Sequence, residues 1–175
     1  MATKAEAFRR QAQRDMVCYR HVLSLAIPDG GAGDCSALHF LQMAVEKLAK
    51  AVQLKREPSA SVESSHQAVS GLVRTLKRPD VTRVLGRSGK AARYRGSLES
   101  VRWALSALER LHPQLAGNGP NLEYPWSQWA DGTEEDWVAP AQVRLDPAGL
   151  ASPTYRNTAV LSFIDMLLER FGELP

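Results

Sequence analysis

SALHFLQMAVEKLAKAV, residues 36–52, is the stretch that decides the fold. Its large apolar residues recur at steps of three and four: Leu38, Leu41, Val45, Leu48 and Val52. This spacing places the side chains on one stripe of an α-helix. Beside the stripe runs a row of small residues that permits close helix packing: Ala37, Ala44 and Ala51. The stretch therefore predicts a helix buried along one wide face.

Similar apolar spacing predicts long helices at residues 4–26 and 97–115, and a final helix that begins at Ser152 and Pro153. Residues 65–77 predict a shorter, extra helix, which Pro79 ends. No strand pattern of note accompanies them. We therefore expect an all-α fold, an antiparallel four-helix up-and-down bundle in a single domain that spans residues 1–175.

Residues 116–152 differ from the helical segments, because they hold four of the ten prolines and three of the four tryptophans. We expect a long, irregular Trp-rich loop before the last helix. Its tryptophans are Trp126, Trp129 and Trp137. Two interpretations stay open: they anchor a protein interface, or they pin the loop onto the end of the bundle.

Charge is distributed unevenly along the chain. Residues 74–95 hold eight Lys or Arg against one Asp, and residues 116–175 hold three against nine Asp or Glu. Opposite blocks indicate either mutual docking or a basic face left free for an anionic partner. We expect a short helical turn and then a basic loop within residues 80–95. The candidate contacts to RNA or nucleotide are Arg83, Arg87, Lys90, Arg93, Tyr94 and Arg95, with the Tyr ring available for base stacking.

Other sequence features limit the classes of protein. The two cysteines, Cys18 and Cys35, lie apart, and the charged N-terminal residues lack the apolar run of a signal peptide. We therefore expect a cytoplasmic protein that neither enters nor crosses a membrane. The sequence contains no phosphate-binding Gly-rich loop, no His and Cys cluster at zinc spacing and no G-x-S-x-G turn. We expect no cofactor, no metal and no self-contained catalytic site.

Residues 36–52 also carry a motif. The order Q-x-A-x-E-K-x-x-K-A is formed by Gln42, Ala44, Glu46, Lys47, Lys50 and Ala51. The segment resembles the most recognisable helix of the HEPN family, the higher eukaryote and prokaryote nucleotide-binding helical domains. His66 is similarly located to the family's turn before the next helix, and Tyr124 with Pro125 resembles its motif before the last helix. The resemblance implies a HEPN-like bundle, in which Glu46 and Lys50 form a favourable i, i+4 pair.

Many members of that family are metal-independent ribonucleases with an R-x(4 to 6)-H motif near the last two helices. There the Arg stabilises phosphate charge while the His moves a proton. This chain departs from the pattern, because no histidine follows His112 and Glu123 stands where an Arg would precede the Tyr-Pro pair. A literal match joins Arg14 to His21 in the first helix. The weak catalytic candidates are therefore Arg14, His21 and His66.

The resemblance implies a non-catalytic or degenerate HEPN-like binding subunit that contacts protein partners and RNA or nucleotide. We expect a homodimer or a subunit of a larger assembly, in a toxin–antitoxin or antiviral defence setting. One alternative is a metal-independent ribonuclease toxin with a relocated active site. Another is an accessory subunit of a nucleotidyltransferase.

Overall fold

The computed structural model describes residues 2–25, 32–62, 68–86, 91–116, 122, 126–130, 134–138 and 158–175. For residues 32–34, 68, 91–97, 100, 114, 126–130, 134–138 and 158–159 it describes the backbone alone. The elements are α1 (Lys4–Ser24), α2 (Ala32–Arg56), α3 (Ala68–Leu76), α4 (Pro79–Leu85), α5 (Ala91–Arg110), α6 (Pro113–Ala116), β1 (Trp126–Ala130), β2 (Glu134–Val138), α7 (Thr158–Glu169) and the 3₁₀ turn η3 (Phe171–Glu173). The helical class is confirmed, and the up-and-down four-helix arrangement remains a prediction.

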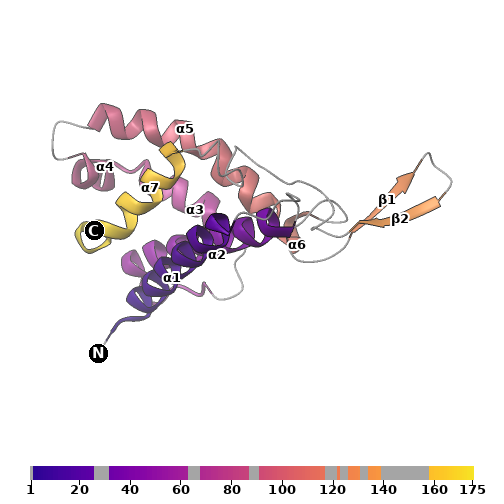
Figure 1. Cartoon of the computed structure of the whole chain (residues 1–175). Helices are drawn as coiled ribbons and strands as arrows, with labels where there is room; N and C mark the ends of the chain where they lie inside the picture. The colour runs from indigo at the N-terminus through magenta and orange to yellow at the C-terminus, as the bar shows by residue number, and fades with distance from the viewer. Residues whose placement is uncertain are drawn as a thin grey trace.

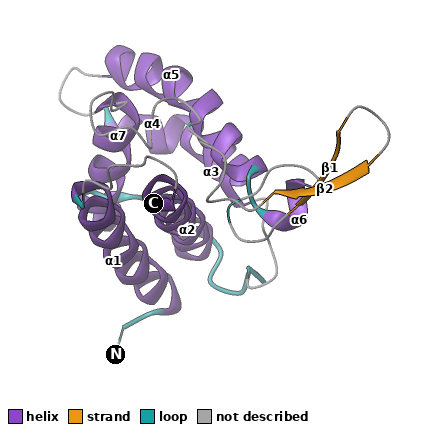
Figure 2. Cartoon of the chain, turned by 45° about the vertical axis from the view of Figure 1, so that its right-hand side comes forward, coloured by secondary structure: helices purple, strands orange, loops and turns teal. Residues whose placement is uncertain are grey.

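The first helix starts where the sequence provides a cap. The Thr3 side chain accepts a hydrogen bond from the backbone N–H of Glu6 at 3.2 Å, and the Glu6 carboxylate lies in the positive first turn. The α1 and α2 helices then lie side by side and antiparallel, as both views of the chain show (Figures 1 and 2). The α5 helix packs against α7 on another side of the body.

The apolar stripe of α2 forms the centre of the core, as the sequence predicts. Its five large residues are each at most 2% exposed, and its three alanines are fully buried. The other helices add buried residues that face this stripe or extend the core: Met16 and Tyr19 from α1, Leu105 and Leu108 from α5, and Ile164 and Leu167 from α7. One connected apolar cluster results.

Polar contacts join α7 and the residue that follows it to α1 and α4. The Arg20 guanidinium in α1 binds the carboxylate of Asp165 in α7 at 2.6 Å. Arg170, after α7, donates to the carbonyl oxygens of Leu85 at 2.7 Å and Val84 at 3.0 Å. The last carbonyls of a helix lack intrahelical donors, so Arg170 caps the C-terminal end of α4.

The basic stretch is more helical than the sequence suggested. We expected a short helical turn and then a basic loop within residues 80–95. The short helix α4, Pro79–Leu85, agrees with the turn, but α5 already starts at Ala91, where the loop was expected. Proline at the first helical position favours α4. Strong helix formers in the first turn of α5 offset the cost of about 1 kcal/mol that Gly96 brings to a helix interior. Residues 87–90 lie outside the described ranges.

The Trp-rich segment is also not wholly irregular. An antiparallel ladder joins β1 to β2, with Trp126 opposite Val138 and Ser127 opposite Trp137 (Figure 1). The sequence between the strands contains Asp131-Gly132, a pair typical of hairpin turns that the helical interpretation overlooked. The expected start of the last helix at Ser152 and Pro153 lies outside the described residues, and α7 begins at Thr158. Among the residues described, no helix has the length and apolar character that a membrane span requires.

Truncation of the central stripe gives a direct test of this core. We expect Leu41→Ala to lower the free energy of unfolding by about 2 to 5 kcal/mol, because a fully buried side chain leaves a cavity. Urea unfolding followed by circular dichroism measures the change. Val17→Ala on α1 is the control, since Val17 is 61% exposed and should cost little. Equal effects of the two substitutions would contradict the assigned core.

Candidate functional site

The motif residues of α2 lie largely inside the protein, where Gln42, Glu46 and Lys50 are buried and Lys47 is partly buried. The Gln42 amide donates to the carbonyl oxygen of Leu108 in α5 at 2.8 Å. Lys47 binds Asp15 of α1 at 2.6 Å, and the carboxylate of Asp15 is 8% exposed. Glu46 and Lys50 form the predicted i, i+4 ion pair at 2.6 Å, with side chains 9% and 6% exposed. The motif therefore joins α2 to α1 and α5.

A second buried carboxylate, absent from the sequence-based candidates, caps α3. Glu109 in α5 accepts hydrogen bonds from the backbone N–H groups of Val69 at 3.0 Å and Ser70 at 3.3 Å, and from the Ser70 hydroxyl at 2.8 Å. These N–H groups belong to the first turn of α3, which has no intrahelical acceptors for them. The anion also complements the positive end of the helix dipole. Glu109 is 8% exposed, so the contact is shielded from water.

The polar motif residues of α2 and the Glu109 cap line one small cavity. Gln42 and Glu46 line it from α2, Glu109 lines it from α5, and His112 follows α5. Its volume of about 10 Å³ is close to the space for a single water molecule. A nucleotide requires a pocket of several hundred Å³. This polar cluster therefore supports the fold and cannot be the ligand site.

Arg14 and His21, the R-x(6)-H match, are both exposed on α1. Seven residues along a helix correspond to about two turns, a rise of roughly 10 Å. The exposed Val17 occupies the same face between them. Neither side chain forms a hydrogen bond or ion pair with any residue that the structure describes. The pair is thus an exposed Arg and His on one face of α1, away in sequence from the last two helices near which the family has its motif.

The predicted basic contacts are only partly described. Arg83 in α4 is exposed and forms no ion pair with a described residue. Arg93, Tyr94 and Arg95 lie in the first turns of α5, where the backbone alone is described. The remaining predicted residues fall outside the described ranges: His66, Arg87, Lys90, Tyr124 and Pro125. For Trp126, Trp129 and Trp137 the structure gives the positions in the hairpin ladder.

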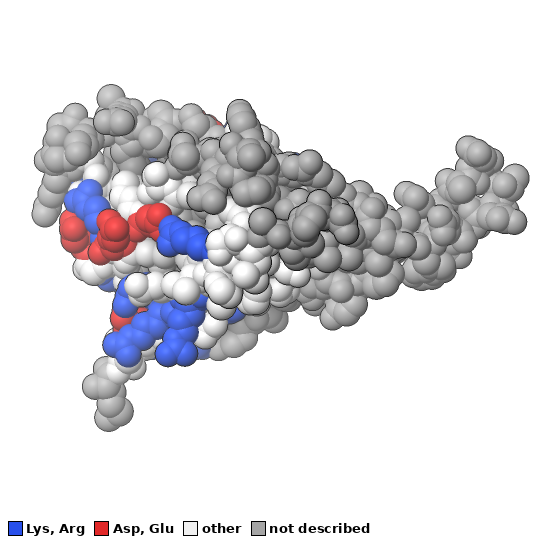
Figure 3. All heavy atoms as spheres, viewed as in Figure 1, with Lys and Arg blue, Asp and Glu red and all other residues white. Residues whose placement is uncertain are grey.

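The acidic and basic blocks do not neutralise each other within the described residues. In the basic block, Lys77 pairs with Glu99 at 2.7 Å and Arg78 pairs with Asp80 at 3.3 Å, both local acids. Figure 3 shows Lys and Arg side chains gathered over α1, whereas over α7 the Asp and Glu side chains lie beside further Lys and Arg side chains. Arg74 stays exposed and without an ion pair to a described residue. Part of the basic surface is therefore open to an anionic partner.

An open groove lies between the end of α2 and α3, with a volume of about 440 Å³. Arg56 contributes a guanidinium from α2 and Arg74 contributes one from α3. Neither group forms a hydrogen bond or ion pair with a described residue. Gln53 and Thr75 add neutral hydrogen-bonding groups, and Glu57 adds one carboxylate. We call this hollow the α2–α3 groove.

Gly71 keeps the groove open on the α3 side. A Cβ atom built at this position meets no other atom within 4 Å. The absence of a side chain therefore leaves open space beside Arg74 in the groove. It does not create a cavity in the core. Sequence reasoning noted Arg74 within the basic run but missed Arg56, because the two residues approach each other only through tertiary packing.

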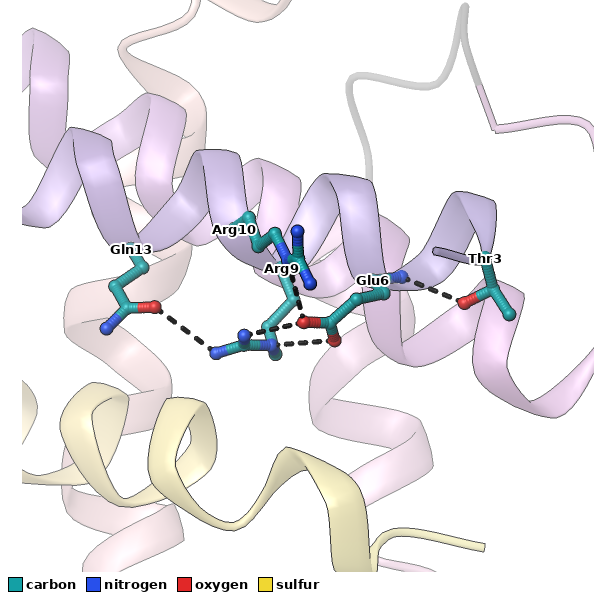
Figure 4. A network of polar contacts seen from close by, with 5 residues as sticks. All are labelled: Thr3, Glu6, Arg9, Arg10 and Gln13. Atoms are coloured by element: carbon teal, nitrogen blue, oxygen red, sulfur yellow. Dashed lines mark hydrogen bonds and ion pairs between the residues drawn. The ribbon is translucent and has the colours of Figure 1, made fainter. Parts of the chain in front are cut away.

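A polar network covers the start of α1 (Figure 4). The Glu6 carboxylate accepts hydrogen bonds from Arg9 at 2.6 and 2.8 Å and from Arg10 at 3.1 Å, and Arg9 also donates to Gln13 at 3.3 Å. The Arg9 hydrogen bonds are the largest cause that holds the pKa of Glu6 at about 2, below its ordinary value of 4.5. These arginines are therefore already paired with an acid, unlike those of the α2–α3 groove.

No protein family model matches the chain, and neither a curated protein nor a solved structure is detectably similar to it. The HEPN resemblance thus rests on the motif residues alone. No group of three or more His, Cys, Asp or Glu side chains suited to a metal ion occurs in the part of the chain that the structure describes.

The Glu109 cap can be tested by removing its carboxylate. We expect Glu109→Ala to lower the free energy of unfolding by about 1 to 3 kcal/mol and to speed amide hydrogen exchange in α3, because the buried N–H of Val69 and the partly buried N–H of Ser70 lose their acceptor. Hydrogen exchange read by mass spectrometry measures the local effect. Glu99→Ala on the same helix is the matched control, since Glu99 is half exposed and binds only at the surface. Unchanged exchange in α3 would show that Glu109 does not cap it.

The low pKa of Glu6 predicts a dependence of stability on pH. Because the folded pKa is about 2 and the ordinary value is 4.5, the stabilisation is complete above pH 4.5 and is lost as the pH falls towards 2. We expect the free energy of unfolding to fall less steeply over this range in Glu6→Gln than in the unmodified protein. Urea unfolding at several pH values measures the two slopes. Glu57→Gln gives the baseline, and equal slopes for Glu6→Gln and the unmodified protein would contradict the prediction.

Proposed function

We propose that this chain is a non-catalytic, HEPN-like binding subunit that holds the phosphate backbone of single-stranded RNA in the α2–α3 groove. The observation that carries the proposal is the presence of two exposed guanidinium groups, Arg56 and Arg74, on the two walls of one groove. Arginine forms bidentate hydrogen bonds to phosphate oxygens, and pairing with phosphate would satisfy both groups. Two parts of the proposal are inferred from the HEPN resemblance: that the ligand is RNA, and that the helices form a four-helix bundle.

The composition of the groove favours recognition of the backbone over recognition of bases. Its lining residues include no aromatic side chain on which a base could stack. Gln53 and Thr75 can donate to phosphate or ribose oxygens, contacts that carry little sequence information. The chain has a net charge of +3 and an isoelectric point near 9.0, which favours association with a polyanion. We therefore propose binding with little sequence preference.

The geometry of the catalytic candidates supports a binding role over a ribonuclease role. Arg14 and His21 lie on α1, away in sequence from the last two helices near which the family carries its R-x(4 to 6)-H motif. The family motif residues are occupied with internal contacts to α1 and α5. Attachment to a protein partner, as a homodimer or within a larger assembly in toxin–antitoxin or antiviral defence, remains part of the proposal by resemblance.

Charge reversal in the groove tests the proposal. We expect the double variant Arg56→Glu, Arg74→Glu to weaken binding of a labelled single-stranded RNA at least about tenfold. The slope of log affinity against log salt should also become shallower, by about 1 to 2, because fewer counterions are released. Fluorescence anisotropy over a range of salt concentrations measures both quantities. Gly71→Leu should also weaken binding, because its side chain occupies the groove without changing charge.

The matched control is Arg102→Glu with Arg110→Glu, two exposed arginines of α5 that give the same change in net charge. We expect this control to retain most of the affinity. Unchanged RNA binding in the groove variants would refute the groove as the site. RNA cleavage that His21→Ala abolishes would instead support the ribonuclease alternative.

A further inference from the structure

A second hollow lies where the start of α1, the end of α2 and η3 meet. Its volume is about 450 Å³, within the range of small-molecule pockets. Leu54, Phe171 and Ala5 line it with buried apolar surface, and Pro58 extends this wall. We call it the Lys55 pocket. Its lining residues do not include any residue of the α2–α3 groove.

One cation lies against the apolar wall of this pocket. The Lys55 ammonium donates to the carbonyl oxygens of Phe171 and Gly172, each at 2.7 Å, and lies 5.2 Å from the centroid of the Phe171 ring. An ammonium group has three N–H donors, so one remains for a further acceptor. The two carbonyl bonds also fix the position of the charge.

The charge of Lys55 has no anionic hydrogen-bond partner among the described residues. Both of its acceptors are neutral carbonyls, and Lys55 forms no ion pair with a described residue. Glu6 also lines the pocket, but its carboxylate is bound by Arg9 and Arg10. Burial lowers the pKa of Lys55, and the more distant Glu6 charge raises it only in part. A partly buried cation is stabilised when an anion joins it.

We propose that the Lys55 pocket binds a small monocarboxylate with an apolar body, of the medium-chain acyl or aromatic acid class. The carboxylate accepts the third N–H of Lys55, and the apolar body contacts Leu54, Pro58 and Phe171. The Thr3 hydroxyl lines the same pocket, and its oxygen accepts from the N–H of Glu6, which leaves its O–H to donate to the ligand. Lys4 adds positive charge to the rim. This site is independent of the RNA proposal.

A carboxylate fits this pocket better than a phosphate does. A phosphate dianion calls for several charge-assisted donors, as a cluster of arginines provides. Here the donors are one N–H of the fixed Lys55 ammonium, the Thr3 hydroxyl and Lys4 at the rim, beside an apolar wall, and the lining residues include no arginine. Such a wall with few polar groups is typical of pockets that take small amphipathic molecules.

Gly172 provides a way to fill the pocket without disturbing the core. A Cβ atom built there meets nothing within 4 Å, although Gly172 lines the pocket. Gly172→Leu should therefore occupy the space of the ligand while it leaves the Lys55 ammonium and its carbonyl bonds in place. Lys55→Met removes the charge and keeps most of the apolar stem. The second substitution also removes a contact to η3, so each variant is first checked by thermal unfolding.

Isothermal titration calorimetry at pH 7 with octanoate and benzoate, beside the neutral octanamide and benzamide, tests the proposal. We expect at least one of the acids to bind the unmodified protein at least about tenfold more tightly than its amide, since a charged hydrogen bond contributes more than a neutral one. Lys55→Met should abolish that preference. Gly172→Leu should weaken binding at least about tenfold, a loss of about 1.4 kcal/mol.

Gly71→Leu is the matched control, because it fills the other hollow in the same manner. It should leave binding of the acids unchanged. The proposal is refuted if neither acid binds the unmodified protein at millimolar concentration, or if the acids bind Gly172→Leu and the unmodified protein equally. If Gly71→Leu loses RNA binding but still binds the acid, the two sites act independently.

Discussion

The polar side chains buried along α2 constrain the rest of the fold, because each must find a partner away from water. An unsatisfied buried polar group costs about 1 to 3 kcal/mol, which is large beside the net stability of a domain. The Gln42 amide nitrogen meets this requirement by donating to the backbone of α5, whereas its buried amide oxygen has no hydrogen-bond partner among the described residues. Lys47 meets the requirement by binding Asp15 of α1. Apolar packing alone would allow these helices to slide, whereas the polar contacts define how α1 and α5 lie against α2.

This constraint changes how the HEPN-like motif is to be interpreted. Its Gln, Glu and Lys residues determine the fold, so their presence indicates an architecture more than an activity. Among the described residues, charged side chains line two hollows near the end of α2. Arg56 and Lys55 are neighbours in sequence, yet they line different hollows. The end of α2 thus separates a polar groove with two arginines from an apolar pocket with a fixed lysine.

Sequence alone predicted what depends on local spacing and missed what depends on distant packing. The stripe of α2 and the Glu46–Lys50 pair follow from helical periodicity, and the structure contains both. The Glu109 cap lies about forty residues from α3 in sequence, and no spacing rule connects them. The early start of α5 and the β-hairpin were missed for another reason, because glycines and prolines were taken to exclude regular structure. The predicted RNA contacts, from Arg83 to Arg95, and the roles predicted for the Trp-rich segment stay predictions.

The Glu109 cap makes the α3 wall of the groove depend on α5. The α3 helix has nine residues, fewer than an isolated helix needs to be stable in water, so it depends on the α5 carboxylate. The preceding residue, Leu108, holds α2 through its carbonyl oxygen. One turn of α5 is therefore bound to both helices of the groove, to α3 at its first turn and to α2 at Gln42. Displacement of this turn by a partner would shift α3 against α2 and so change the width of the groove.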